Sequence, residues 1–415
     1  IAESRDISQV EGQRPVERFM QEYFSHSMAI AEITGRFVNR HRRRSVSTIL
    51  KRLVMSHRVN RYFVLSEGEL DVAPAQLAKI CTTLDDILRI YHSAAMYRAS
   101  LSPRLIEAIK STARNLPSGP SPESSRLFME ILGTVGRSSA IVRSMHDTNV
   151  LELVIPEWQR VRCLLQFNQY HHFTVDEHTL RCLEICEGFA EDDTPVGAAY
   201  RNIHNKQLLH LALILHDAGK GFEEEHSELG RRMSLEICQR LRLSQHETDI
   251  VSFLVHKHLK MADLSFRYDT TDPRVVLEFS HDVGSAEKLR MLFVLTAADV
   301  SGVGPEVWTN WKADLLADFY KRLMMNLSGQ PPRFHEEERL REIREHVYDS
   351  IVPLEPENDE VATSMRRWVD KQLDSFSSQY LTMTPPQMIA RDLDIIRSLK
   401  PGEIRVDGRY DKTSG

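Results

Sequence analysis

Apolar residues recur every three to four positions along most of the chain. The pattern is clearest in the stretches Val16–Val38, Leu77–Ala95 and Ser285–Val300. This spacing places the apolar side chains on one face of a helix, so each stretch is predicted to form an amphipathic helix. The fold is therefore expected to be mainly α, built from many helices that each bury one face.

Local signals refine this prediction. Asp272 followed by Pro273, and Ser285 ahead of an apolar run, are typical residues for the start of a helix. In the first third of the chain, one convincing strand pattern occurs at Arg61–Val72, with Glu67-Gly68 as its turn. We expect a small hairpin or extended excursion there.

Two stretches rich in Pro, Gly and Ser divide the chain, Asn115–Ser125 and Leu327–Arg333. Near the end, helical periodicity gives way to an alternating segment and a turn at Leu399–Gly415. The predicted organisation is an N-terminal helical region (1–120), a central domain (121–330), a helical tail (331–400) and the start of a further domain or a disordered end (401–415).

Composition limits the kinds of protein that the chain can be. Its 415 residues carry 53 Lys and Arg against 59 Asp and Glu, so no basic field predicts a nucleic acid or an anionic membrane as partner. The sequence shows no apolar run of the roughly 20 residues that span a bilayer. Five cysteines without C-x-x-C spacing favour a reducing, cytoplasmic location. Cys182 and Cys186 are interpreted as small buried thiols on a helix face.

Histidines and aspartates gather at the predicted ends of several central helices. His216-Asp217 closes the apolar run LLHLALILHD, where an ionised carboxylate is costly unless it is paired or binds a cation. Imidazole and carboxylate ligands together suit a first-row divalent ion, and an aspartate can bridge two ions. The residues that share this context are His178, His216, Asp217, His226, His256, His258 and Asp299.

The order of these residues resembles the HD superfamily of metal-dependent phosphohydrolases. The stretches HHFTVDEHTLR (171–181), LHDAGKG (215–221), HSELG (226–230), HLKM (258–261) and LTAADVSGVGPEVWTNWKADLL (295–316) are similar to the HD domain of the bacterial PII uridylyltransferase/uridylyl-removing enzyme family. The tail Val361–Ile396 resembles the segment that leads into this family's regulatory ACT domains. The family's nucleotidyltransferase motif has no counterpart in the sequence, so we expect a central piece of a larger enzyme.

The resemblance implies an HD-type fold and a set of metal ligands. On it, the ligands are His178, His216, Asp217, His226, His258 and Asp299, holding a divalent metal, with two ions expected: Mn²⁺, Fe²⁺ or Mg²⁺, and also Zn²⁺. The ligand role of the family's His-His pair is assigned to His258. His171 and His256 are candidates for contacting the ligands without binding the metal themselves. Two ions held in this way could lower the pKa of a bridging water towards about 7.

The implied reaction is hydrolysis of a phosphodiester, removing UMP from a tyrosine of the PII signal protein, with glutamine as an effector acting through domains missing from the chain. Asp217 and Lys220 are the predicted catalytic residues. Two roles remain open for Lys220, a phosphate contact or a cap on the carbonyls of the helix ending at Asp217. Arg181, Arg267 and Lys312 are further candidates for contacting the phosphate or substrate.

Two other functions stay open from the sequence. One is a stand-alone HD phosphohydrolase acting on a free nucleotide or cyclic dinucleotide. The other is a non-catalytic HD signalling module. The presence of a competent ligand at each expected metal position argues against the module, and the long helical flanks argue against the stand-alone enzyme.

Overall fold

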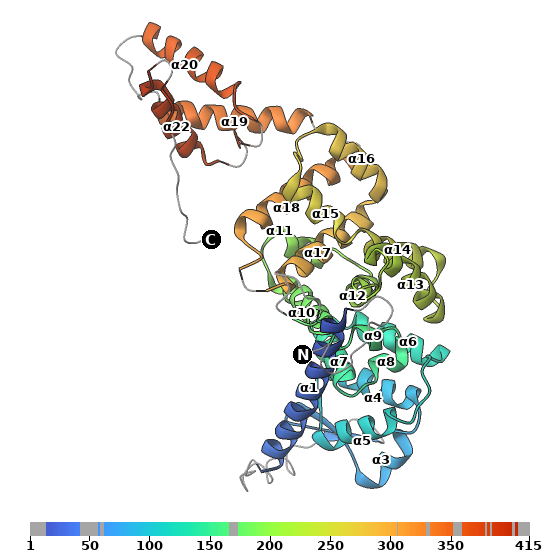
Figure 1. The fold of residues 1–415 in the computed structure, drawn as a ribbon. Coiled ribbons are helices and arrows are strands. Elements are labelled where there is room, and N and C mark those ends of the chain that lie inside the picture. The colour runs from blue at the N-terminus through green and yellow to red at the C-terminus, as the bar shows by residue number, and fades with distance from the viewer. Residues whose placement is uncertain are drawn as a thin grey trace. The chain divides into compact units, whose positions relative to one another are not determined.

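The computed structural model describes most of the chain (Figure 1). The described residues are 14–41, 57–58, 62–165, 173–304, 306–328, 333–351, 359–377, 380–381, 384–400 and 403–405. They fall into two compact units. The first comprises Ile1–Ala262 with Arg290–Trp308, and the second comprises Asp263–Leu289 with Thr309–Gly415.

The fold is mainly α, as predicted. The helices up to residue 257 lie in the first unit: α1 (Pro15–His41), α3 (Pro74–Ile80), α4 (Leu84–Met96), α5 (Pro103–Ala113), α6 (Pro122–Gly133), α7 (Ser138–Asp147), α8 (Leu151–Val154), α9 (Trp158–Val161), α10 (Val175–Gly188), α11 (Pro195–Arg201), α12 (Lys206–Leu215), α13 (His226–Arg240) and α14 (Gln245–Lys257), with a 3-10 turn, η2 (Phe189–Glu191). The helices α15 (Lys260–Arg267) and α17 (Ala286–Gly302) run from one unit into the other.

The second unit carries the remaining helices, α16 (Pro273–Val283), α18 (Asn310–Leu327), α19 (Arg333–Ile351), α20 (Asp359–Leu373) and α22 (Pro386–Ser398). Helices α19 and α22 pack against each other around a small apolar cluster that includes Val347, Val369 and Leu393. Of the predicted segment 401–415, only 403–405 are described, and these have no regular structure. The domain boundaries at 120, 330 and 400 remain predictions.

A small sheet forms where the strand pattern was predicted. Strands β2 (Phe63–Ser66) and β3 (Glu69–Val72) pair antiparallel, and Glu67 and Gly68 turn the chain with φ of 51° and 76°. The short strands β1 (His57–Arg58) and β4 (Ser100–Leu101) flank them in the order β1-β2-β3-β4, with β4 parallel to β3. The hairpin is confirmed; two-residue strands carry too little pattern to be predicted.

One stretch predicted as a single helix forms two helices. The stretch Leu77–Ala95 is divided between α3 and α4, with a break at residues 81–83. Thr83 accepts a hydrogen bond from the Asp86 amide, and the Asp86 carboxylate accepts one from the Thr83 amide. This reciprocal cap starts a new helix inside a sequence whose apolar spacing reads as continuous. The predicted caps Asp272 and Ser285 are confirmed at α16 and α17.

Helix α12 is the centre of the first unit. Every side chain from Leu208 to Leu215 is buried, because α6, α10 and α14 pack around it. Burial of each leucine stabilises the fold by roughly 1.5–3 kcal/mol. His216, which follows this helix as its C-cap, is therefore buried in the interior of the unit.

A buried polar network fixes the beginning of α10, the helix that carries His178. The Asp176 carboxylate accepts a hydrogen bond from the Cys163 amide at 2.8 Å, and its Oδ2 lies 3.6 Å from Nε2 of His146. Trp158 donates its indole N–H to Nδ1 of His146 at 3.0 Å. Burial, with the nearby Arg162 guanidinium, lowers the pKa of His146 to about 3. The start of α10 is thereby tied to α7 and α9.

This network predicts a pH dependence of stability. The pKa of His146 is lower in the folded state than the roughly 6.5 of an unfolded chain, so the unfolded state binds more protons below pH ~6.5. The contribution of His146 is present above that pH and is lost as pH falls. His146→Gln keeps an acceptor for Trp158 but cannot titrate. We expect urea unfolding at pH 7, 6 and 5 to give a slope of stability against pH that is shallower in the variant by up to about 1.4 kcal/mol per unit. Parallel slopes for the two proteins would contradict the prediction.

Among the described residues, no helix combines the length and the apolar character that crossing a membrane requires.

Candidate metal centre

Six predicted ligands lie in the first unit, each close to a helix end. The starts of α10 and α13, the ends of α12 and α14 and the last turns of α17 supply these residues. The ligands are His178 in the first turn of α10, His216 at the C-cap of α12, Asp217 after it, His226 as the first residue of α13, His258 at the C-cap of α14, and Asp299 near the end of α17.

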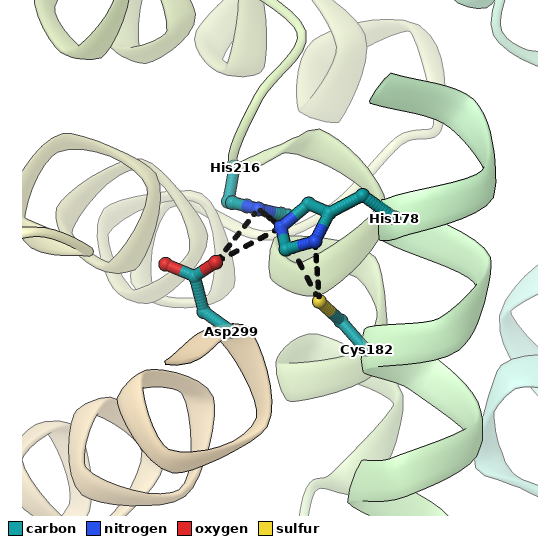
Figure 2. Close-up of side chains that lie close together, drawn as sticks. All are labelled: His178, Cys182, His216 and Asp299. Atoms are coloured by element: carbon teal, nitrogen blue, oxygen red, sulfur yellow. Dashed lines mark hydrogen bonds and ion pairs between the residues drawn. The ribbon is translucent and has the colours of Figure 1, made fainter. Parts of the chain in front are cut away.

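A first group of ligand atoms is formed by His178, His216 and Asp299 (Figure 2). Nε2 of His178 lies 3.0 Å from Oδ1 of Asp299 and 3.4 Å from Nε2 of His216. Nε2 of His216 lies 3.7 Å from the same Asp299 oxygen. Two imidazole nitrogens and a carboxylate oxygen thus face one point, a donor set that suits a divalent cation.

A second group is formed by Asp217, His226 and His258, whose ligand atoms all lie within 4.8 Å of one another. The Nε2 atoms of His226 and His258 are buried, and neither has a hydrogen-bond partner within the described parts of the chain. An unpaired buried nitrogen costs about 1–3 kcal/mol, so two that face the same carboxylate need an explanation. A cation held between them and Asp217 supplies one.

Asp217 links the two groups. Its Oδ2 lies 3.3 Å from Nε2 of His216 and 3.8 Å from Nε2 of His178, while its Oδ1 lies 3.8 Å from Nε2 of His258. The side chain is buried, and Nζ of Lys220 forms an ion pair with Oδ2 at 2.7 Å. A carboxylate placed in this way can serve ions on both sides.

The backbone fixes the orientation of two imidazole rings by the same device. His216 donates its Nδ1 hydrogen to the carbonyl of Leu213 at 2.7 Å, and His258 donates its Nδ1 hydrogen to the carbonyl of Val255 at 2.7 Å. Each carbonyl is three residues earlier in the chain, at the end of the helix. A proton on Nδ1 leaves the lone pair on Nε2, which points into the site and is free to bind a metal.

The charges of the site are strongly perturbed. Burial raises the pKa of a carboxyl group, but the imidazole of His216 and the ammonium of Lys220 hold the pKa of Asp217 well below its usual range. Burial lowers the pKa of His258 to about 4, helped by the nearby His216, so this imidazole is neutral at pH 7. Burial opposes the charge of Lys220 as well, yet Asp217 raises the pKa of its ammonium. Asp217 is therefore an anion next to a lysine cation.

Gly219 allows the His-Asp turn to approach α13. A Cβ atom at this position would lie 2.2 Å from the carbonyl oxygen of His226. Glu225 caps α13 by accepting hydrogen bonds from the amides of Ser227 and Glu228, which fixes His226 at the first helical position. The glycine and the cap together set the distance between Asp217 and His226.

The other predicted residues are placed differently. The imidazole of His256 is partly exposed and lies 3.4 Å from the carboxylate of Glu228, a residue outside both ligand groups. The Arg181 guanidinium stacks on the Phe173 ring at 4.2 Å. Arg267 pairs with Asp263 at 3.2 Å, and the Lys312 ammonium lies 5.9 Å from the Phe266 ring, both within the second unit. His171 lies outside the described residues.

Cys182 also belongs to the first group, although the sequence predicted only a small buried thiol at this position. Its Sγ lies 3.5 Å from Nε2 of His178, and it is one of the four side chains that share the group (Figure 2). The signal was present in the sequence, since His178 and Cys182 are four residues apart on one helix and so share a face. From the sequence, Cys182 and Cys186 were both interpreted as small buried thiols on a helix face.

Comparison with known proteins defines the class. Residues 175–295 match the HD domain family, a range that contains His178, His216, Asp217, His226 and His258. The chain therefore contains an HD domain over these residues.

Comparison with individual proteins points to one kind of enzyme. Over most of its length, the chain is similar to bifunctional uridylyltransferase/uridylyl-removing enzymes. It is 31% identical to the enzyme of Cereibacter sphaeroides, covering 86% of the chain and 39% of the relative. It is 33% identical to that of Ruegeria pomeroyi (74% and 34%) and 34% identical to that of Azospirillum brasilense (77% and 35%). The chain thus spans less than half the length of these relatives.

Gly219→Ala tests the close approach of the His-Asp turn. The new methyl group meets backbone, which cannot move aside cheaply, so we expect a loss of stability of about 1–3 kcal/mol and weaker metal binding. Thermal unfolding and a metal titration measure the two effects. Gly188→Ala is the matched control, because nothing lies within 4 Å of a Cβ there. Equal behaviour of the two variants would show that the approach is not tight.

The two groups predict a pattern of metal loss. We expect His258→Ala and Asp299→Ala each to lose one of two bound ions, and Asp217→Ala to lose both, because Asp217 faces both groups. Metal content of the purified proteins after loading with Mn²⁺ and desalting measures this. His256→Ala, a neighbouring histidine that pairs with Glu228, serves as the control and keeps both ions. Equal metal content in all four variants would contradict the assignment.

Proposed function

We propose that the chain hydrolyses a phosphodiester in a metal-dependent reaction, and that its substrate is PII signal protein carrying UMP on a tyrosine. The observation that carries the chemistry is the position of Asp217 between two sets of imidazole ligands. The choice of substrate is supported by the similarity to enzymes whose name includes uridylyl-removing activity. The cytoplasm, where this signalling would take place, is the location we propose.

The residues of the site divide the work of this reaction. A bound divalent ion would supply Lewis-acid chemistry and lower the pKa of water towards neutrality. His178, His216 and Asp299 would hold one ion and His226 and His258 another, with Asp217 shared. The buried walls around them keep the local dielectric low, so the charges act strongly on a phosphate. A tyrosine phenolate, with a pKa of about 10, leaves without needing a strong acid.

Lys220 supports this proposal through its position. Its ammonium lies 2.7 Å from Oδ2 of Asp217, the oxygen that also faces His216. A cation held there is next to the place where negative charge grows on the phosphate oxygens during hydrolysis. The same contact restrains Asp217 before a substrate arrives. We therefore assign Lys220 to the phosphate rather than to capping α12.

Assaying several substrates side by side tests the proposal. The chain, supplied with Mn²⁺, is incubated with PII-UMP, with free nucleotides and with a cyclic dinucleotide, and released nucleotide is measured. We expect UMP release from PII-UMP only, reduced at least about 100-fold in His216→Ala and Asp217→Ala, since losing a direct ligand costs more than the 10–100-fold of an outer partner. His204→Ala is the control histidine, exposed and without a role in either group.

Other outcomes would select the alternatives. Hydrolysis of a free nucleotide or cyclic dinucleotide but not of PII-UMP would favour a stand-alone phosphohydrolase. Failure to bind a divalent ion and to hydrolyse any of the substrates would favour a non-catalytic signalling module. We also propose glutamine as an effector, and we expect its addition to leave the rate of the 415-residue chain unchanged.

A further inference from the structure

The thiol of Cys182 faces the first ligand group from inside the core. Cys182 is buried, and its Sγ lies 3.5 Å from Nε2 and 3.7 Å from Nδ1 of His178. The sulfur, a nitrogen of His178, a nitrogen of His216 and an oxygen of Asp299 all lie within 4.8 Å of one another. In Figure 2 the thiol closes the side of the group opposite Asp299. Four donor atoms from three helices thus surround one point.

A glycine makes room for the sulfur. Gly302 is the last residue of α17, three positions after Asp299, and a Cβ there would lie 2.4 Å from Sγ of Cys182. The same Cβ would lie 3.3 Å from Nδ1 of His178. The helix that carries the carboxylate ligand therefore passes directly over the thiol, and a side chain at position 302 would push the sulfur or the imidazole away. The sulfur of Cys182 can therefore lie next to the imidazole of His178 because position 302 has no side chain.

We propose that Cys182 is a ligand of the ion held by His178, His216 and Asp299, and that its sulfur makes this position select thiophilic divalent ions such as Zn²⁺, Fe²⁺ or Co²⁺ over Mn²⁺ and Mg²⁺. The inference rests on the metal site of the proposed function. Thiolate sulfur is a soft donor that favours these ions, and coordination displaces the thiol proton to solvent. The second group, Asp217, His226 and His258, contains only nitrogen and oxygen donors. The two positions consequently differ in the ions that they prefer.

The other buried thiol of the same helix shows what an ordinary core cysteine looks like here. Cys186 lies one turn further along α10 and is also buried, but it belongs to neither ligand group among the described residues. The groups that act electrostatically on its thiol are Glu187, Cys182 and Lys206. Cys186 is therefore a matched control: it has the same residue type, helix and burial as Cys182, but it lies outside both ligand groups.

Absorption spectroscopy with Co²⁺ tests the proposal independently of activity. Co²⁺ bound to thiolate gives a sulfur-to-metal charge-transfer band in the near ultraviolet, which nitrogen and oxygen ligands do not give. The metal-free 415-residue chain is titrated with Co²⁺, alongside Cys182→Ala, Cys182→Ser and Cys186→Ser, and bound cobalt is counted after desalting. We expect the band in the unchanged chain and in Cys186→Ser, and its loss in both Cys182 variants.

Competition for the site gives a second readout. We expect Zn²⁺ affinity of the first position to fall about 10- to 100-fold in Cys182→Ala, and Mn²⁺ affinity to fall less. Circular dichroism and thermal unfolding establish that the variants fold, and Cys182→Ser supplies a second folded variant if alanine leaves a damaging cavity.

The outcomes separate this inference from the proposed function. Cobalt bound without the band, or with the band unchanged in the Cys182 variants, would overturn the role of Cys182 while leaving the metal site intact. No cobalt, zinc or manganese bound by the folded chain would overturn the metal site and the inference together.

Discussion

The carboxylate of Asp217 lies in a space walled by apolar helices, and an ionised carboxylate in such a place is costly unless cationic or metal partners surround it. His216, His178 and Lys220 lie near one oxygen of the carboxylate, and His258 lies near the other. The rest of the centre is arranged to deliver them. The buried apolar helix α12 places the His-Asp pair, and carbonyls at the ends of α12 and α14 orient His216 and His258.

The same need connects stability with function. An aspartate and several histidines that face one another without a bound cation hold opposing charges and unpaired nitrogens in the core, and His226 and His258 each carry such a nitrogen. The fold tolerates this because the surrounding helices pack tightly and because α10 is tied down by the network of His146, Trp158 and Asp176. A site that is costly for the protein alone becomes favourable once cations enter, which is the usual relation between a metal centre and its fold.

Much of this was accessible from the sequence. The helical period predicted α1 and α17, the turn pair Glu67-Gly68 predicted the hairpin, and the cap residues Asp272 and Ser285 predicted two helix starts. The break between α3 and α4 was missed, because apolar spacing continues through it and only the reciprocal cap of Thr83 and Asp86 stops the helix. The candidate ligands could be named because the residue types, their order and their places at helix ends form a pattern, with a family resemblance to choose among neighbours such as His256 and His258.

What the sequence determined by itself was therefore the kind of element on which each candidate ligand lies and the chemistry that such residues favour, since both depend on residue type and local spacing. Only the tertiary structure decided how the candidate ligands divide into two groups, that Asp217 lies close to both, that Lys220 pairs with Asp217, and that Cys182 faces the first group. These features depend on distances between helices far apart in the chain. Such distances are set by close packing, as where Gly302 passes over Cys182 and Gly219 meets His226, and no local pattern encodes them.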